Sequence, residues 1–269
     1  MQINFGQPKV SNTTNILDIE IPEQMQNSIP TGNVFMDSLF AGDGILPSTV
    51  ALVTGVPGAG KSTLMMQLAD SMTGSGHIAL YNANEESLYQ VKRVVNRLSL
   101  RNGFVVGYNR DVVEIINHAD KLKTDNPDKK IFLFVDSLQT LDVSKKKGQR
   151  GRNFSRLNMQ VEATERLTLW AKENFTCVFI IGQVTKAGEF TGKQDIKHAV
   201  DCHLHLAFHR EHRYGPEERF ARMEKNRFGV AGIFQNFSLS ARGIQFVTPK
   251  IEGEELDDDE DNEAEEVSV

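Results

Sequence analysis

Cysteine is scarce in this 269-residue chain, which contains only Cys177 and Cys202 and no C-x-x-C pair. This scarcity excludes a cysteine zinc module and is consistent with a reducing cytoplasm. No apolar run approaches the roughly 18 residues that a membrane span needs, so we expect no membrane contact. The N-terminal segment has no basic stretch followed by an apolar one. We therefore expect no secretory signal and a cytoplasmic location.

Positive charge is missing from the C-terminal segment. Residues 252–269 carry eleven acids and no Lys or Arg, and without them the formal net charge changes from −6 to +5. We expect a mildly basic folded body at 28–250, preceded by a polar arm at 1–27 and followed by a disordered acidic tail at 251–269. The tail has two open interpretations: a solubilising appendage, or a segment that competes for a cationic surface or docks on a recombinase or replication partner.

Strand and helix patterns alternate along the body. Short apolar runs predict buried strands, and these lie at 50–54, 77–81, 131–135 and 177–181. Helical spacing predicts four helices, and these lie at 61–72, 85–98, 111–122 and 155–173. Alternating side chains after residue 200 predict more strands, at 202–208, 219–225, 233–239 and 244–247. This order predicts an α/β fold with a mainly parallel central sheet that antiparallel strands extend.

A glycine-rich segment follows the first predicted strand and matches G-x-x-x-x-G-K-[ST]. Its glycines let backbone N–H groups turn inward around a phosphate, at the positive end of the next helix. An accidental glycine turn is the other interpretation, which the flanking strand and helix oppose. Lys61 is expected to reach the β- and γ-phosphates of ATP, and Ser62 to ligate Mg²⁺. The predicted ATP-binding residues are Gly55, Val56, Pro57, Gly58, Ala59, Gly60, Lys61, Ser62 and Thr63.

Carboxylates follow two other predicted strands. Asp136 ends the run at 131–135, where a carboxylate can hold Mg²⁺, although an Asp after a strand is often a turn residue or a helix cap. Glu85, preferred over Glu86, is the predicted base that activates the attacking water. The other interpretation of this segment is helix capping, with Asn84 as the N-cap and the acids in the first turn.

Several further segments match one family pattern. They are residues 30–32 with Leu39 and 44–47; 81–98; 135–140; 182–186 with Gly192, His198, Val200 and Asp201; and the pentapeptide Lys-Asn-Arg-Phe-Gly at 225–229. Through them, about residues 28–248 resemble the ATPase domain of the RadA/Sms family of bacterial RecA-like proteins. The pentapeptide is more specific than any P-loop.

The resemblance implies a RecA-like P-loop NTPase that forms a ring, expected to be a hexamer, with ATP between subunits and DNA in the pore. It implies that Lys225 and Arg227 reach the γ-phosphate of the neighbouring subunit, although a solvated strand end is the other interpretation. It also implies that Gln183 is a polar sensor of that phosphate, at a position where the family has histidine. The family usually has an N-terminal four-cysteine zinc module and a C-terminal Lon-like domain, and this sequence carries neither.

A run of cations follows Asp136, where RecA-like proteins place their first pore loop. These cations are Lys145, Lys146, Lys147, Arg150, Arg152 and Arg156. Phosphate contacts by Lys and Arg give affinity without sequence preference, so we expect the chain to bind single-stranded DNA. In the second loop, Lys186, Phe190 and Lys193 are expected to add contacts. A basic loop that is merely exposed to solvent is the other interpretation.

The favoured function is a DNA-dependent ATPase that handles single-stranded or branched DNA in recombination and repair. The alternative is a KaiC-like ATPase, in which nucleotide state controls the binding of a partner. A small-molecule kinase is disfavoured because no lid or acceptor-site pattern is visible. His203 and His205 fall on one face of a predicted strand, but no Cys or carboxylate obviously completes a metal site with them.

Overall fold

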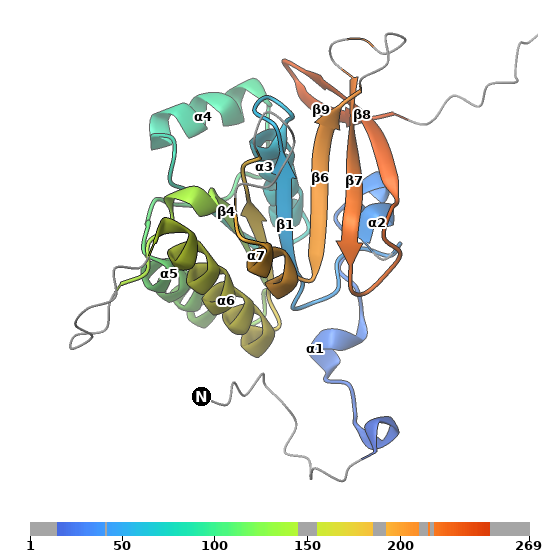
Figure 1. Cartoon of the computed structure of the whole chain (residues 1–269), viewed down its shortest axis with the longest axis vertical. Coiled ribbons are helices and arrows are strands. Elements are labelled where there is room, and N and C mark those ends of the chain that lie inside the picture. Colours follow the sequence, from blue (N-terminus) through green and yellow to red (C-terminus); the bar gives the residue numbers. More distant parts are fainter. Residues whose placement is uncertain are drawn as a thin grey trace, which may run out of the picture.

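A single mixed sheet forms the centre of the computed structural model, which describes residues 15–40, 42–144, 155–184, 192–209, 215 and 218–247. Over these residues the strand order is β3-β2-β4-β5-β1-β6-β7-β8-β9 (Figure 1). The first six strands in this order are parallel, and β7 to β9 continue the sheet in antiparallel pairs. The expected mainly parallel α/β sheet with an antiparallel extension is therefore confirmed. The strands are β1 (Val50–Gly55), β2 (Ile78–Ala83), β3 (Val105–Gly107), β4 (Ile131–Asp136), β5 (Cys177–Ile181), β6 (Cys202–Phe208), β7 (Glu218–Asn226), β8 (Phe234–Ser240) and β9 (Gly243–Phe246).

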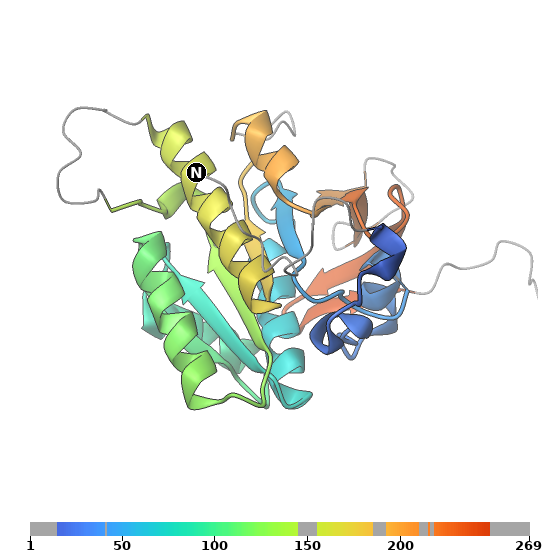
Figure 2. The same cartoon turned by 90° about the horizontal axis from the view of Figure 1, so that it is seen from below.

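Helices cover both faces of the parallel part of the sheet, and Figure 2 shows α5 and α6 side by side on one face. Side chains on successive residues of β1 enter two different cores: Ala51 and Val53 pack with α2 and α3, and Val50 and Leu52 pack with α5 and α6. This double burial explains why the parallel strands have continuous apolar sequences. The helical segments are η1 (Ile16–Asp18), α1 (Glu23–Gln26), α2 (Val34–Phe40), α3 (Lys61–Gly74), α4 (Leu88–Arg97), α5 (Val112–Asp125), η2 (Leu138–Thr140), α6 (Arg156–Asn174) and α7 (Gln194–Ala199). Over the residues described, none of the helices is both long and apolar enough to cross a membrane.

The start of α4 differs from the expected helix at 85–98. Ser87 caps α4 through a capping box, in which its side chain accepts from Gln90 N and the Gln90 side chain accepts from Ser87 N. The two hydrogen bonds satisfy donors that the helix cannot satisfy itself. Asn84 as the N-cap was therefore wrong, and Glu85 lies in the turn that joins β2 to α4.

Four neighbouring strands, β1, β2, β4 and β5, run parallel, so their carboxyl ends all lie along the same side of the sheet, which we call its carboxyl edge. The chain leaves β1 through α3 and reaches β2 beyond β5 and β4. In open parallel sheets, ligands bind at the carboxyl ends of the strands where the order reverses in this way. The glycine-rich segment, Glu85, Asp136 and Gln183 follow β1, β2, β4 and β5, and all of them therefore lie along this carboxyl edge.

Candidate functional site

The glycine-rich loop turns the chain from β1 into α3. Gly60 has φ +100°, a left-handed conformation that side chains rarely adopt, and it directs the backbone into the helix. At Gly55 an added Cβ would collide with Leu206 O, because the loop passes close to β6. Gly60 provides no side-chain cap for α3. The first N–H groups of α3 therefore face the loop, an arrangement that suits an anion.

Lys61 lies across this loop. Its ammonium donates to Gly55 O at 2.7 Å and to Val56 O at 3.2 Å. Burial lowers the pKa of Lys61, and the nearby charges of Asp136 and Glu85 oppose that shift. A phosphate bound in the loop offers this ammonium a charged acceptor in place of two neutral carbonyls, which makes a stronger hydrogen bond. The observed position of Lys61 is therefore compatible with its predicted role in phosphate binding.

The predicted Mg²⁺ ligands lie side by side. Ser62 hydrogen-bonds to the Asp136 carboxylate, and Tyr81 Oη donates to Asp136 Oδ2 at 2.7 Å. Burial raises the pKa of Asp136, with a further contribution from the charge of Glu85, whereas the two hydroxyl hydrogen bonds and Lys61 oppose the rise. Carboxylate and hydroxyl oxygens are the hard donors that Mg²⁺ prefers, so these residues fit the ion that the sequence implies.

Glu85 connects the ends of three strands. Its Oε1 accepts a hydrogen bond from Ser137 Oγ, next to Asp136, and another from Gln183 Nε2 at 3.1 Å. Burial raises the pKa of the neighbouring Glu86, and the charges of Asp136 and Glu85 raise it further. The hydrogen bond to Gln183 joins Glu85, and not Glu86, to the end of β5. The structure therefore brings the predicted base and the predicted sensor into direct contact.

Lys225 and Arg227 lie at the opposite, amino edge of the sheet. Lys225 Nζ donates to Lys197 O at 2.7 Å and to Val200 O at 2.6 Å. The end of β7 lies beside the start of β6, and the start of β6 lies beside the start of β1. The glycine-rich loop follows the other end of β1, so the length of β1 separates these cations from the loop. Six strand residues at about 3.3 Å each span roughly 20 Å. Neither cation reaches the phosphate loop of its own chain.

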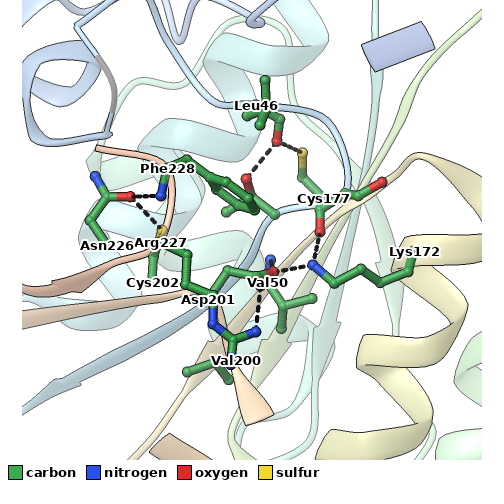
Figure 3. Close-up of polar contacts among 12 residues, drawn as sticks. Leu46, Val50, Lys172, Cys177, Val200, Asp201, Cys202, Asn226, Arg227 and Phe228 are labelled. Atoms are coloured by element: carbon green, nitrogen blue, oxygen red, sulfur yellow. Dashed lines mark hydrogen bonds and ion pairs between the residues drawn. The ribbon is translucent and has the colours of Figure 1, made fainter. Parts of the chain in front are cut away.

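A buried carboxylate holds Arg227 in place (Figure 3). Asp201 is 1% exposed, and its Oδ1 pairs with Arg227 Nη1 at 3.2 Å. Its Oδ2 pairs with Lys172 Nζ at 2.6 Å and accepts from Val50 N at 3.0 Å. Lys172 Nζ also lies 5.6 Å from the centre of the Phe228 ring. The pentapeptide is thus attached to the starts of β1 and β6 and to the C-terminal part of α6.

The two strand histidines are joined by a threonine beneath the phosphate loop. Thr54 Oγ1 lies 2.7 Å from His203 Nε2 and 2.9 Å from His205 Nδ1, and His203 Nδ1 lies 3.2 Å from Glu224 Oε2. Burial lowers the pKa of His203 to about 3, so its ring is neutral near pH 7. A neutral His203 that donates to Glu224 accepts from Thr54 at Nε2. No potential metal cluster of three or more His, Cys, Asp or Glu is present among the described residues.

Only part of the predicted DNA-binding set can be located. Arg156 begins α6, pairs with Asp142 at 2.8 Å and donates to Gln139 O at 3.0 Å from Nε. Lys193 precedes α7 and donates to Asn158 Oδ1 at 2.5 Å. The remaining members lie outside the described residues: Lys145, Lys146, Lys147, Arg150, Arg152, Lys186 and Phe190.

Sequence reasoning missed three side chains that shape these sites. Tyr81 donates to Asp136, Ser137 donates to Glu85, and Lys172 pairs with Asp201. A signal was available for Ser137, which directly follows the predicted metal ligand. Tyr81 gave a weaker one, because a polar aromatic group inside a buried strand requires a hydrogen-bond partner. Lys172 lies on a long helix, and nothing local indicated its partner.

The parallel sheet, the glycine loop at its carboxyl edge and the carboxylates beside that loop define a RecA-like P-loop ATPase domain. Solved structures share this fold. A DnaB-like replicative helicase has a TM-score of 0.67 at 16% identity, and the match covers 80% of this chain and 60% of that chain. A RadB recombinase has a TM-score of 0.55 at 23% identity, with coverage of 81% and 99%.

Sequence relatives identify the family. No family profile matches the chain. The DNA repair protein RadA of Mycobacterium tuberculosis is 34% identical over 216 residues, which are 80% of this chain and 42% of the relative. RadA of Haemophilus influenzae is 35% identical over 211 residues, 77% of this chain and 42% of the relative. Over its ATPase domain the chain belongs to this RadA family. It spans less than half the length of these relatives.

Proposed function

We propose that this chain hydrolyses ATP and uses the cycle to handle single-stranded or branched DNA during recombination and repair in the cytoplasm. The observation that carries the proposal is the convergence of Lys61, Ser62, Glu85, Asp136 and Gln183 on one edge of the sheet. Relatives over four fifths of the chain bear the name DNA repair protein RadA, which favours DNA as the substrate.

The proposed roles follow from the contacts. Lys61 would bind the β- and γ-phosphates, and Ser62 and Asp136 would hold Mg²⁺, which would neutralise phosphate charge. Glu85, fixed by Ser137 and Gln183, would orient the attacking water and accept its proton. A base held in position by two hydrogen bonds loses little freedom when the reaction begins, which favours catalysis.

The cations of the pentapeptide support assembly from several copies. Lys225 and Arg227 lie roughly 20 Å from the phosphate loop of their own chain, the length of β1 at about 3.3 Å per residue. They can therefore stabilise phosphoryl charge only in a neighbouring copy. Head-to-tail contacts of this kind generate a ring when the rotation between successive copies closes, and a helical filament when it does not. We propose a ring, expected to be a hexamer, with each ATP between a loop and the neighbour's cations.

A contact between the site and the second loop supports coupling to DNA. Gln183 donates to Glu85 and lies only a few residues before Lys186 and Phe190 in the sequence. A change at the γ-phosphate would therefore reach this segment through one side chain. We propose that Lys186, Phe190 and Lys193, with the cations at 145–156, bind single-stranded DNA by phosphate contacts and base stacking.

The direct test is ATP turnover of the full chain with and without single-stranded DNA. Stimulation by DNA, with affinity that falls as salt rises, is the expected result. Replacement of Lys145, Lys146 and Lys147 by Ala should spare basal turnover and weaken DNA binding. Turnover that ignores DNA would instead favour the KaiC-like, partner-controlling ATPase. DNA affinity that ignores both salt and these lysines would contradict the first-loop assignment.

The acidic tail offers a separate test of partner binding. Removal of residues 252–269 takes away eleven negative charges. If the tail competes with DNA for cations, its removal should tighten DNA binding, and the change should shrink at high salt. Unchanged DNA affinity would leave the tail as a solubilising segment or as a docking peptide for a recombinase or replication protein.

A further inference from the structure

A buried carboxylate lies against Arg227, the cation expected to act on the neighbouring copy. Asp201 directly precedes β6 and is 1% exposed, whereas the Arg227 side chain is 49% exposed. Arg227 Nη1 pairs with Asp201 Oδ1 at 3.2 Å, and Arg227 Nη2 donates to His198 O at 2.9 Å. A guanidinium carries several further N–H donors. Part of Arg227 is therefore held by its own chain, while about half of the side chain remains open to an acceptor from outside.

The backbone of Asp201 fixes the same region. Asp201 N donates to Val50 O at 2.9 Å, and Arg227 N donates to Asp201 O at 3.1 Å. The Asp201 carboxylate accepts a further hydrogen bond from Val50 N at 3.0 Å. Asp201 thus connects the residue after β7 to the start of β1, which lies in the middle of the sheet. A side chain that is attached to a rigid element in this way loses little freedom when it meets its target.

The charges around Asp201 leave Arg227 as the cation available to a partner. Lys172 Nζ pairs with Asp201 Oδ2 at 2.6 Å and also donates to Ser48 O at 3.2 Å (Figure 3). Two cations share one carboxylate, so this group of three side chains has a net positive charge. The Lys172 side chain is only 23% exposed, so the excess positive charge is most accessible at Arg227. An accessible cation in a fixed position suits a phosphoryl group that gains negative charge during transfer.

We propose that Asp201 is a positioning residue, which holds the Arg227 guanidinium in the conformation that acts on ATP in the loop of the neighbouring copy. This inference rests on the proposed function, from which it takes the action of Arg227 between copies. Without the carboxylate, the charges of Lys172 and Arg227 repel each other without compensation, and Arg227 gains rotamer freedom. Asp201 lies at the amino edge of the sheet, away from the loop of its own chain. Its loss should therefore impair the neighbour's site and spare its own.

Steady-state turnover of full-length Asp201→Asn gives the first readout, at a temperature where the variant is folded. Its kcat should fall at least about tenfold, because a misplaced cation stabilises the transition state poorly. Its KM for ATP should stay within about twofold, because its own loop is intact. Ile115→Ala is the control, since Ile115 is fully buried between the sheet and α6 and its truncation should lower the melting temperature comparably. An equal fall of kcat in this control would attribute the effect to lost stability and overturn the inference.

Mixing of variants separates action on the neighbour from damage within the chain. Asp201→Asn keeps an intact loop, and Lys61→Ala keeps both Asp201 and Arg227. In an equal mixture, about a quarter of the interfaces should join the loop of an Asp201→Asn chain to the Arg227 of a Lys61→Ala chain. If Asp201→Asn alone keeps about a tenth of the turnover, the mixture should exceed the sum of the separate chains about fivefold. No gain on mixing would mean that the substitution damages its own loop, and the inference would be wrong.

A binding measurement gives a readout that does not depend on turnover. ADP with aluminium fluoride imitates the phosphoryl group during transfer, whereas ADP alone lacks that group. Asp201→Asn should retain ADP with aluminium fluoride at least about tenfold less tightly and ADP alone within about twofold, because Arg227 is expected to contact only the transferred group. An excess of Lys61→Ala chains should restore the retention. Equal weakening of both ligands would indicate a distorted loop and would contradict the positioning role.

A second variant covers the case in which Asp201→Asn does not fold. Asp201→Asn combined with Lys172→Met leaves no partly buried ammonium without its carboxylate, and replacement of a buried pair by uncharged groups is often tolerated. Arg227 still lacks its anchor in this double variant. It should therefore show the same low kcat, the same gain on mixing with Lys61→Ala and the same selective loss of ADP with aluminium fluoride.

The outcomes separate this inference from the proposed function. If Arg227→Ala mixed with Lys61→Ala recovers turnover and Asp201→Asn mixed with Lys61→Ala does not, the positioning role is wrong and the action between copies stands. An unchanged kcat in folded Asp201→Asn would lead to the same conclusion. If neither mixture recovers, the action of Arg227 between copies is wrong, and the positioning role fails with it.

Discussion

Replacement of Asp201 by Asn should destabilise the domain more than any comparable change of a surface ion pair. The buried Asp201 carboxylate pairs with Lys172 Nζ at 2.6 Å and Arg227 Nη1 at 3.2 Å, and it accepts from Val50 N at 3.0 Å. Asn keeps an oxygen for Val50 but removes the charge that both cations neutralise. Breaking a buried pair costs about 3–5 kcal/mol, and partial exposure of both cations lowers the expected cost to about 2–3 kcal/mol.

Thermal and urea unfolding measure this loss in the free energy of unfolding. For a domain of this size each kcal/mol shifts the melting temperature by about 2–4 °C, so Asp201→Asn should lower it by about 4–12 °C. Asp142→Asn is the matched control, because Asp142 pairs with Arg156 at 2.8 Å while both side chains are about half exposed. Its cost should stay within about 0.5 kcal/mol. Equal losses in the two variants would refute the claim that burial makes the Asp201 network stabilising.

Three further results are expected from the site. Lys61→Ala and Arg227→Ala chains should each be inactive alone. When they are mixed in equal amounts, about a quarter of the interfaces should combine an intact Lys61 with an intact Arg227, and measurable turnover should return. No recovery on mixing would contradict action between copies. Glu85→Gln should lower turnover by on the order of 10²- to 10⁴-fold while ATP binding persists, and turnover within tenfold of the unaltered chain would exclude Glu85 as the base. Tyr81→Phe removes a hydrogen bond that lowers the pKa of Asp136. The pKa of Asp136 should therefore rise, and the carboxylate should be protonated at a higher pH than in the unaltered chain. The acid limb of the pH–rate profile should therefore move to higher pH, and an unmoved limb would separate Tyr81 from metal binding.

Elements set by local pattern were predictable, and elements set by distant contacts were not. The strand at 177–181 has the expected bounds, because five apolar residues covered on both faces leave little freedom. The start of α4 was misplaced because acids after a strand resemble a first helical turn, while Ser87 and Gln90 form the actual cap. The three-residue β3 was missed because it depends on pairing with β2.

The same distinction applies to the candidate site. The position of Lys61 follows from its own loop and helix, so one segment of sequence was enough to expect it. The surroundings of Lys225 depend on the antiparallel register of β6 and β7, which no short pattern encodes. That register leaves Lys225 on carbonyls at the C-terminal end of α7, those of Lys197 and Val200. It also supplies the separation that excludes action on its own loop. The surroundings of Lys225 come from segments that are distant in the sequence, so they could be identified only from the folded sheet.

The central claim is that the loop at 55–62 and its neighbouring carboxylates bind ATP with Mg²⁺ and hydrolyse it. The most direct measurement is phosphate release from ATP by the purified full chain, with and without Mg²⁺, beside Lys61→Ala. The account predicts release that requires Mg²⁺ and disappears in the variant. Release that persists without the Lys61 ammonium, or a chain that neither retains nor cleaves ATP when Mg²⁺ is abundant, would contradict it.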